Sequence, residues 1–210
     1  MPGLSARGLT WRAGPGRYGL APDPLEVAPR EIVTVCAADP VAGRALADVL
    51  AGLAEPEDGT LEVDGRVALV PPGGALLPDL TVAANLALGL RAHSAADLRG
   101  RVERAARLLQ VEGALELHPD RLSAAQQLRA GMARALAGDP AVVVLEDRTS
   151  MPRCGPAVAA AAERVAVLVI TDDLARVRSR PEQEWTAVRL EPVVRRRAAH
   201  RAGRDPAAGR

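Results

Sequence analysis

The sequence predicts an α/β fold with a core of parallel strands, an antiparallel β flank and a helical subdomain. Three apolar runs, EIVTVC, AVVVL and VAVLVI, have the continuous hydrophobicity of strands buried on both faces of a parallel sheet. Segments with helical periodicity separate these runs along the chain, which is typical of a parallel sheet. Further β-signals near both ends of the chain predict the antiparallel flank.

The predicted elements follow from local patterns of apolar, turn and capping residues. Strands are expected at residues 4–12, 31–36, 60–65, 66–70, 141–145, 165–170 and 184–192, with a weak extended segment at 24–29. The short strand at 66–70 is expected to be buried. The Gly/Pro-rich stretch AGPGRYG predicts a turn at residues 13–19. Helices are expected at residues 43–53, 80–90, 98–114 and 122–138. Ser123 is placed to cap the last of these helices.

The chain of 210 residues is long enough for one sizeable hydrophobic core. We expect a single domain over residues 1–194, with its helical subdomain at about 80–125. Residues 195–210 are rich in Arg, Ala and Gly and low in apolar bulk, which predicts a basic, disordered tail. A contact of this tail with anionic lipid or an acidic partner is the alternative.

Composition excludes several classes of protein. The net charge of +1 gives no electrostatic case for nucleic acid as a partner, and all 27 basic residues are arginine. Any mechanism that needs a lysine ammonium is therefore excluded. Cys36 and Cys154 lack metal-ligand spacing, so no metal site is predicted. Without an apolar run near 18 residues or a leader-like start, we expect a cytoplasmic protein that does not span a membrane by itself.

Three longer segments carry a family resemblance, because they occur in one order and at a characteristic spacing. They are LAGLAEPEDGTLEVDG, LLPDLTVAANLALGL and LSAAQQLRAGMARALAGDPAVVVLEDRTS. Over about residues 9–192 the chain resembles the nucleotide-binding domain of ATP-binding-cassette (ABC) transporters. The resemblance implies a P-loop NTPase-like core with an ABC-type helical subdomain, and the third segment looks like the signature motif running into the Walker B strand.

The family's phosphate loop, Gly-x-x-x-x-Gly-Lys-Ser/Thr, falls between the strand at 31–36 and the helix at 43–53. If the flanking segments stay in register, the glycine, glycine, lysine and hydroxyl positions hold Ala37, Ala42, Gly43 and Arg44. A slip by one residue would place there Ala38, Gly43, Arg44 and Ala45. Neither register supplies the hydroxyl that binds Mg²⁺ in the family.

Two residues inside this loop also act against a bound phosphate. Asp39 places a negative charge where the resemblance puts phosphates, and Pro40 removes a backbone N–H donor. The resemblance implies ATP and Mg²⁺ as cofactors, while the loop predicts that their binding is weakened.

The downstream contact positions have changed as well. Pro72 stands at the family's glutamine that contacts the metal and the attacking water, and Asp172 stands at its histidine. The Walker B acids are Glu146 and Asp147, in the reverse of the family's order. They are the candidate catalytic residues, and a structural ion pair with Arg148 is the alternative.

Two further positions have a functional and a structural interpretation. The signature motif appears as Ser123, Ala124, Ala125 and Gln126, and Ser123 is either a contact to a partner's ATP or a plain helix cap. The adenine-stacking aromatic of the family corresponds to Trp11 or Tyr18. Spacing favours Trp11 only if the hairpin between it and the phosphate loop is longer than is usual in the family. Packing in the core is the alternative.

These changes remove phosphate-binding groups and keep the apolar strands and helix faces. The leading hypothesis is therefore an ABC-transporter ATP-binding subunit with impaired or lost hydrolysis. It would dock on permease subunits at the inner face of the cell membrane, or pair with a competent cassette in a homo- or heterodimer. One alternative is a stand-alone regulatory or binding module on the same fold. Another is an active ATPase that uses Arg44, Glu146 and Asp147.

Overall fold

The computed structural model describes residues 3–21, 23–90, 94–148, 155–173 and 186–192. The tail at 195–210 and the predicted strand residues before Thr186 lie outside this part of the chain. Arg153, which stands where the family resemblance places an aspartate, also lies outside it. So do Cys154 and two of the three histidines, His93 and His200.

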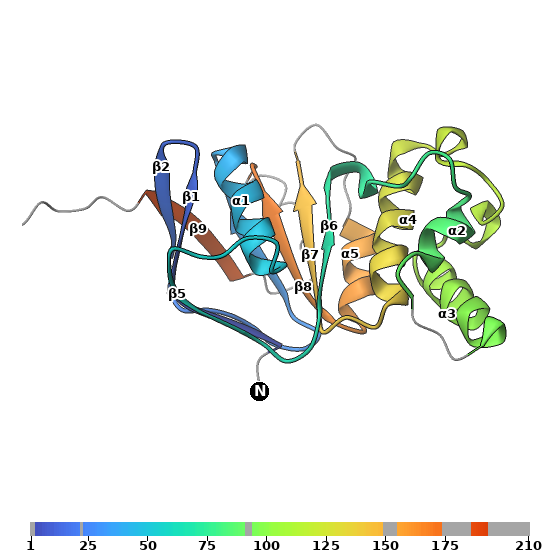
Figure 1. Cartoon of the computed structure of the whole chain (residues 1–210), viewed down its shortest axis with the longest axis horizontal. Helices are drawn as coiled ribbons and strands as arrows, with labels where there is room; N and C mark the ends of the chain where they lie inside the picture. The colour runs from blue at the N-terminus through green and yellow to red at the C-terminus, as the bar shows by residue number, and fades with distance from the viewer. Residues whose placement is uncertain (1–2, 22, 91–93, 149–154, 174–185, 193–210) are drawn as a thin grey trace, which may run out of the picture.

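The described strands form one mixed sheet that runs through the molecule (Figure 1). They are β1 (Leu4–Ala13), β2 (Gly16–Ala21), β3 (Leu25–Val27), β4 (Ile32–Cys36), β5 (Asp58–Val63), β6 (Val67–Val70), β7 (Val142–Asp147), β8 (Ala166–Thr171) and β9 (Thr186–Pro192). Their order is β3-β1-β2-β9-β4-β8-β7-β6, with β5 paired to β1. The strands from β9 to β6 are parallel to one another, while β1, β2, β3 and β5 pair antiparallel, as does β2 with β9. The predicted fold class is confirmed.

The α-helices of the described chain lie on both faces of the parallel strands (Figure 1). They are α1 (Pro40–Leu50), α2 (Val82–Ala87), α3 (Ala95–Leu108), α4 (Ala124–Ala137) and α5 (Gly155–Ala162). Short 3₁₀ helices occur at η1 (Pro72–Gly74), η2 (Glu112–Ala114) and η3 (Pro119–Arg121). Helix α1 lies on one face, between the parallel strands and β1, whereas α4 and α5 cover the other face and α2 and α3 pack outside α4.

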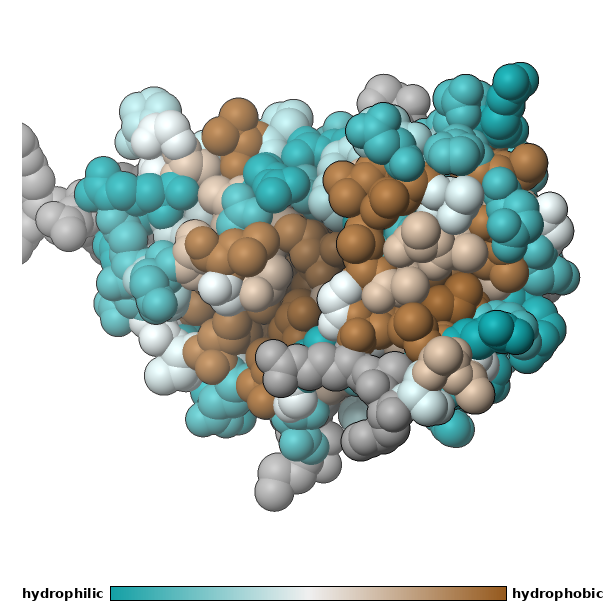
Figure 2. Space-filling model, turned by 45° about the vertical axis from the view of Figure 1, so that its right-hand side comes forward, coloured by the Kyte–Doolittle hydropathy of each residue, from teal (hydrophilic) through white to brown (hydrophobic). Residues whose placement is uncertain are grey.

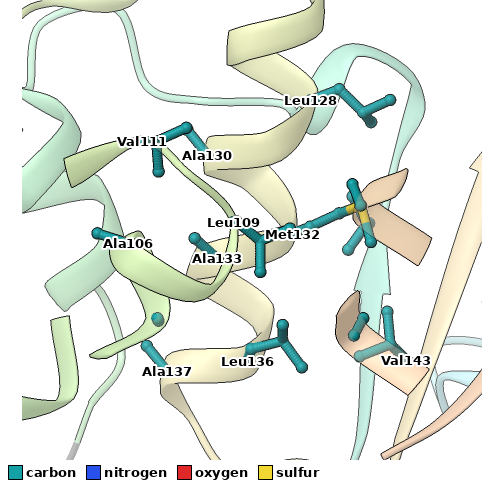
Figure 3. Packing of buried hydrophobic residues seen from close by; sticks show 14 of the residues in the cluster. Ala106, Leu109, Val111, Leu128, Ala130, Met132, Ala133, Leu136, Ala137 and Val143 are labelled. Atoms are coloured by element: carbon teal, nitrogen blue, oxygen red, sulfur yellow. The ribbon is translucent and has the colours of Figure 1, made fainter. Parts of the chain in front are cut away.

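Two hydrophobic cores result, one on each face of the sheet. The core around α4 is shown in Figure 3, where Leu128, Met132 and Leu136 point toward the sheet. The small residues Ala133 and Ala137 face α3 instead, which lets the two helices approach closely. Burial of these apolar side chains is the main source of the fold's stability.

Three expectations about the elements are corrected by the structure. Residues 16–21, assigned to a turn and its flank, form strand β2, which gains its hydrogen bonds by pairing with β1. The first helix begins at Pro40 and not at residue 43, because Asp39 caps it. Strand β6 was expected to be buried, but it is the edge strand and only Val70 is fully buried.

Candidate nucleotide site and its internal contacts

The junction of β4 and α1 is a short turn, since only residues 37–39 separate the strand from the helix. Asp39 has extended backbone angles and is the N-cap of α1. Its Oδ1 accepts hydrogen bonds from the backbone N–H of Val41 at 2.9 Å and of Ala42 at 3.4 Å. Pro40 occupies the first helical position, where a missing N–H costs no hydrogen bond. The free N–H groups of this helix end are thus directed at the chain's own carboxylate.

A tyrosine completes the surroundings of Asp39. The Tyr18 hydroxyl donates a hydrogen bond of 2.6 Å to Asp39 Oδ2. This bond, helped by the backbone N–H of Val41, lowers the pKa of Asp39 below its ordinary value. The same bond raises the pKa of the Tyr18 phenol, because it stabilises the protonated hydroxyl. The carboxylate is therefore held in its charged form.

Trp11 lies beneath this junction in the core. Its side chain is 1% exposed, and its Nε1–H donates to the Ala42 carbonyl at 3.1 Å. The rings of Trp11 and Tyr18 stack with centroids 6.5 Å apart. This position matches the packing alternative for Trp11. Its predicted role in adenine stacking would need a ring face that the described chain buries.

Gly43 stands at the lysine position of the unslipped register and packs tightly. A Cβ on this residue would lie 2.8 Å from Ala37 Cβ and 3.2 Å from Ile170 Cγ2. Any side chain here would therefore enter the contact between α1 and the sheet. Ala37 is itself buried, and its N–H bonds to the Thr171 carbonyl at 2.7 Å. Ala45 is partly buried and packs against the same core.

Glu146, at the end of β7, is held by two arginines. Its Oε1 lies 2.9 Å from Arg44 Nη1 and its Oε2 lies 3.0 Å from Arg148 Nη2. Glu146 is 2% exposed, so the charges of the two guanidinium groups compensate a buried carboxylate. Arg44 also pairs with Asp48 at 2.9 Å, and this hydrogen bond raises the pKa of Arg44. The ion pair expected between Arg148 and one of the Walker B acids is therefore present, and the acid is Glu146.

The other predicted contact residues lie close by at the ends of neighbouring strands. Asp147 is buried and pairs in register with Thr171 of β8, and Asp172 follows Thr171 directly. Pro72 begins η1, after the end of β6. The structure thus brings these residues to the carboxyl-terminal edge of the parallel strands, where open α/β sheets bind ligands.

The η1 segment and Ala75, which follows it, pack against α4 and are hydrogen-bonded to it. Gly74 has a φ of +81°, and a Cβ on it would lie 2.4 Å from the Gln127 carbonyl oxygen. A Cβ on Gly131 would in turn lie 2.4 Å from the Gly74 Cα. Arg134 donates to the carbonyls of Ala75 at 2.9 Å and Gly74 at 3.0 Å. Burial lowers the pKa of Arg134. The contact joins residues about 60 apart in sequence, and no periodic pattern of residues predicts it.

The signature-like residues form the start of α4. The Ser123 hydroxyl accepts from the N–H of Gln126 at 3.3 Å, and Gln126 Oε1 accepts from the N–H of Ser123 at 2.9 Å. This is a capping box, so the predicted cap is confirmed. Ala124 and Ala125 are exposed in the first turn.

ATP and Mg²⁺ can be tested against the residues present. The helix N–H groups that would hold phosphate already bond to Asp39, and both oxygens of Glu146 bond to guanidinium groups. No group of three or more His, Cys, Asp or Glu with metal-site geometry occurs among the described residues. The backbone N–H groups of Val41 and Ala42 and both oxygens of Glu146 thus already have partners within the chain.

Sequence comparison finds relatives among importer subunits. The chain is 35% identical over 136 residues to the spermidine/putrescine import ATP-binding protein PotA of Methylococcus capsulatus, covering 59% of this chain and 35% of that protein. It is 30% identical over 163 residues to the sn-glycerol-3-phosphate import ATP-binding protein UgpC of Salmonella typhi, covering 71% and 46%. The chain thus spans less than half the length of these curated relatives. No protein-family model matches the chain.

Solved structures with the same fold are ABC cassettes. The cbiO1 subunit of Clostridium perfringens, part of an ABC transporter complex, superposes with a TM-score of 0.67 at 17% identity, over 81% of this chain and 78% of that one. A dimeric ATP-binding cassette bound to ADP and Pi superposes with a TM-score of 0.65 at 20% identity, over 90% and 98%. The chain therefore has the fold of ABC cassettes. Its sequence is similar to part of the ATP-binding subunits of ABC importers.

Proposed function

We propose that the chain acts as an ATP-binding-subunit-like component of an ABC importer whose ATP hydrolysis is impaired or lost. It would dock from the cytoplasmic side on membrane permease subunits, alone or paired with a competent cassette. The two relatives named above differ in the substrate that their names give, so the proposal does not extend to a particular substrate. None of the helices in the described ranges is long and apolar enough to cross a membrane.

The contact of Asp39 with the start of α1 is the observation that carries the loss of hydrolysis. A phosphate at this position would have to displace a charged carboxylate from two backbone N–H groups and from the Tyr18 hydroxyl. It would also meet the repulsion of that carboxylate. Phosphoryl transfer depends on positioning and on stabilising the charge of the phosphoryl group. A site that holds its own anion supplies neither.

The pairing of Arg44 with Glu146 supports the unslipped register. In that register Arg44 stands at the hydroxyl position and Glu146 at the first Walker B position, both of which bind Mg²⁺ in the family. Their side chains meet at 2.9 Å, although the residues are 102 apart in sequence. Two positions that share one metal in the family thus share an ion pair in this chain.

The face around α2 supports docking of a partner. Of the exposed large hydrophobic side chains in the described chain, three flank this short helix: Leu77 (48% exposed), Leu88 (41%) and Leu117 (41%). Figure 2 shows apolar side chains gathered on the face over the helical region. Exposed apolar patches on soluble chains mark interaction sites. We assign this face, named here the α2 face, to the permease contact.

Copurification tests the docking part of the proposal. The chain is coexpressed with any permease subunits encoded beside it, and the complex is isolated through a tag on the permease. The double variant Leu88→Glu/Leu117→Glu is expected to lose copurification by tenfold or more. The matched control is Leu53→Glu, which places the same charge at a 68% exposed leucine at the far end of α1 and should copurify normally.

Two other results would contradict docking. Equal copurification of the α2-face variant and the control would show that the α2 face does not contact the permease. No association of the unaltered chain with any permease or cassette subunit would favour the stand-alone regulatory or binding module instead.

A further inference from the structure

Glu146 is the centre of a set of ion pairs between strand β7 and helix α1. Glu146 is the last residue but one of strand β7, and each of its two oxygens is bonded to an arginine from a different segment. Arg44 comes from the second turn of α1, and Arg148 follows β7 directly. Arg148 Nη2 also donates to the carbonyl of Pro40, the first residue of α1, at 3.0 Å. The three residues therefore join the end of β7 to the start of α1.

A buried carboxylate requires such compensation. An ionised carboxylate removed from water without a partner is strongly destabilising, whereas hydrogen-bonded partners of opposite charge offset the cost. Glu146 is 2% exposed, and the side chain of Arg148 is only 20% exposed. The side chain of Arg44 is 43% exposed and shares its charge with Asp48. The Arg148 pair is thus the less solvent-screened of the two.

We infer that Arg44 and Arg148 replace a divalent cation at Glu146, and that they fasten β7 to α1 in the absence of nucleotide and metal. The name "arginine clamp" is used here for Arg44, Glu146 and Arg148. The two guanidinium groups supply the two positive charges that a Mg²⁺ ion would supply. The inference rests on the proposed function for the identity of the site, but it concerns stability and metal independence rather than turnover.

Double-mutant cycles measure the clamp directly. The variants are Glu146→Gln, Arg44→Met, Arg148→Met and the two pairwise combinations, each unfolded in urea with the full chain. Each single arginine variant is expected to raise the equilibrium constant for unfolding about tenfold or more. Each double variant is expected to lose less free energy of unfolding than its two single variants lose together. An exposed ion pair on α3, Glu103 with Arg107 at 3.7 Å, is the matched control. Its coupling should stay below about fivefold.

If Glu146→Gln does not fold, a variant that lacks all three charged side chains of the arginine clamp tests the inference instead. Replacing all three clamp residues with Met removes every charge at once, so no buried ion is left without a partner. This triple variant is expected to unfold less readily than Arg148→Met alone, because Arg148→Met leaves the buried carboxylate with reduced compensation. A triple variant that is less stable than Arg148→Met would contradict the clamp.

The metal arm of the experiment compares unfolding midpoints with Mg²⁺ alone, with Mg²⁺ and ATP, and with EDTA. The unaltered chain is expected to give the same midpoint in all three. A midpoint raised by Mg²⁺ and ATP, and no longer raised in Glu146→Gln, would overturn the inference, because a metal would then be using Glu146. Coupling at Arg148 no larger than at the α3 control would overturn it as well.

These outcomes are separate from the fate of the proposed function. If the chain does not hydrolyse ATP and Glu146 shows no coupling to the two arginines, the proposed loss of hydrolysis stands and the arginine clamp is contradicted. If the chain hydrolyses ATP and its unfolding midpoint does not change with Mg²⁺, the arginine clamp stands and the loss of hydrolysis is contradicted.

Discussion

The Tyr18 hydroxyl on strand β2 lies 2.6 Å from Asp39 Oδ2 at the start of helix α1. This hydrogen bond connects the antiparallel flank to the turn that resembles a phosphate loop. It also fixes the carboxylate against the helix N–H groups, where the positive end of the helix dipole favours an anion. The antiparallel flank therefore takes part in occupying the candidate nucleotide site.

Removing the hydroxyl should be visible in the titration of Asp39. In Tyr18→Phe we expect the pKa of Asp39 to rise toward its ordinary value, because the main group that lowers it is gone. The phenyl ring keeps its stacking on Trp11, so the change is confined to the hydroxyl. Carboxyl-detected NMR measures the shift, and an unchanged pKa would show that the hydrogen bond is not formed in solution.

The same bond predicts a dependence of stability on pH. The pKa of Asp39 is lowered in the folded state, so its contribution is present above the unfolded value of about 3.9 and is lost as the pH falls through the folded pKa. Wild type should thus be more stable than Tyr18→Phe at about pH 6, and the difference should shrink below about pH 4. Urea unfolding at both pH values checks this, and a difference that grows on acidification would contradict it.

The contact of Gly131 with Gly74 predicts a sensitive position in α4. A Cβ at Gly131 would lie 2.6 Å from the Gly74 carbonyl oxygen, so the η1 segment would have to move. We expect Gly131→Ala to lower the free energy of unfolding by about 1–3 kcal/mol, even though alanine favours helices. Gly113→Ala is the control, since nothing lies within 4 Å of its added Cβ. Equal stability of both variants would disprove the tight contact.

Trp11 offers a test of the adenine-stacking prediction. In Trp185→Phe, Trp11 is the remaining tryptophan of the chain. Because Trp11 is buried and donates to the Ala42 carbonyl, its fluorescence should not respond to ATP. Saturable quenching by ATP, absent with an equal concentration of pyrophosphate, would restore the stacking role.

Two variants of Ser123 distinguish its role as a helix cap from a contact with a partner's ATP. Ser123→Ala removes the cap of α4 and should cost about 1 kcal/mol of stability. Ser123→Asp keeps a capping oxygen and should retain that stability. If Ser123 also faces a partner's ATP, Ser123→Asp should slow hydrolysis by the mixed dimer at least tenfold, because its charge repels the γ-phosphate. Unchanged hydrolysis would leave Ser123 as a cap only.

The sequence predicted the parts of the fold that depend on local patterns. The runs at β4, β7 and β8 were readable because strands buried on both faces need continuous apolar side chains. Strand β2 was missed, since its two glycines disfavour strands and its stability comes from pairing with β1. The early start of α1 was readable in principle, because Asp followed by Pro is a helix-start signal.

The contacts within the site were harder to predict. Arg44 and Glu146 are 102 residues apart, and no local pattern connects them. Tyr18 was considered only as a possible adenine contact, and its bond to Asp39 depends on the position of the β1–β2 hairpin. Residue types therefore indicated that phosphate binding is weakened, while the partners of Asp39 and Glu146 required the three-dimensional arrangement.

Binding of ATP by the purified chain is the most direct test of the central claim that the site is already occupied by the chain's own groups. Isothermal titration calorimetry is carried out with ATP, with and without Mg²⁺, on the wild type and on Asp39→Ala. We expect no saturable heat for the wild type, either with or without Mg²⁺. Saturable binding to the wild type that strengthens with Mg²⁺ and is lost in Glu146→Gln would contradict it.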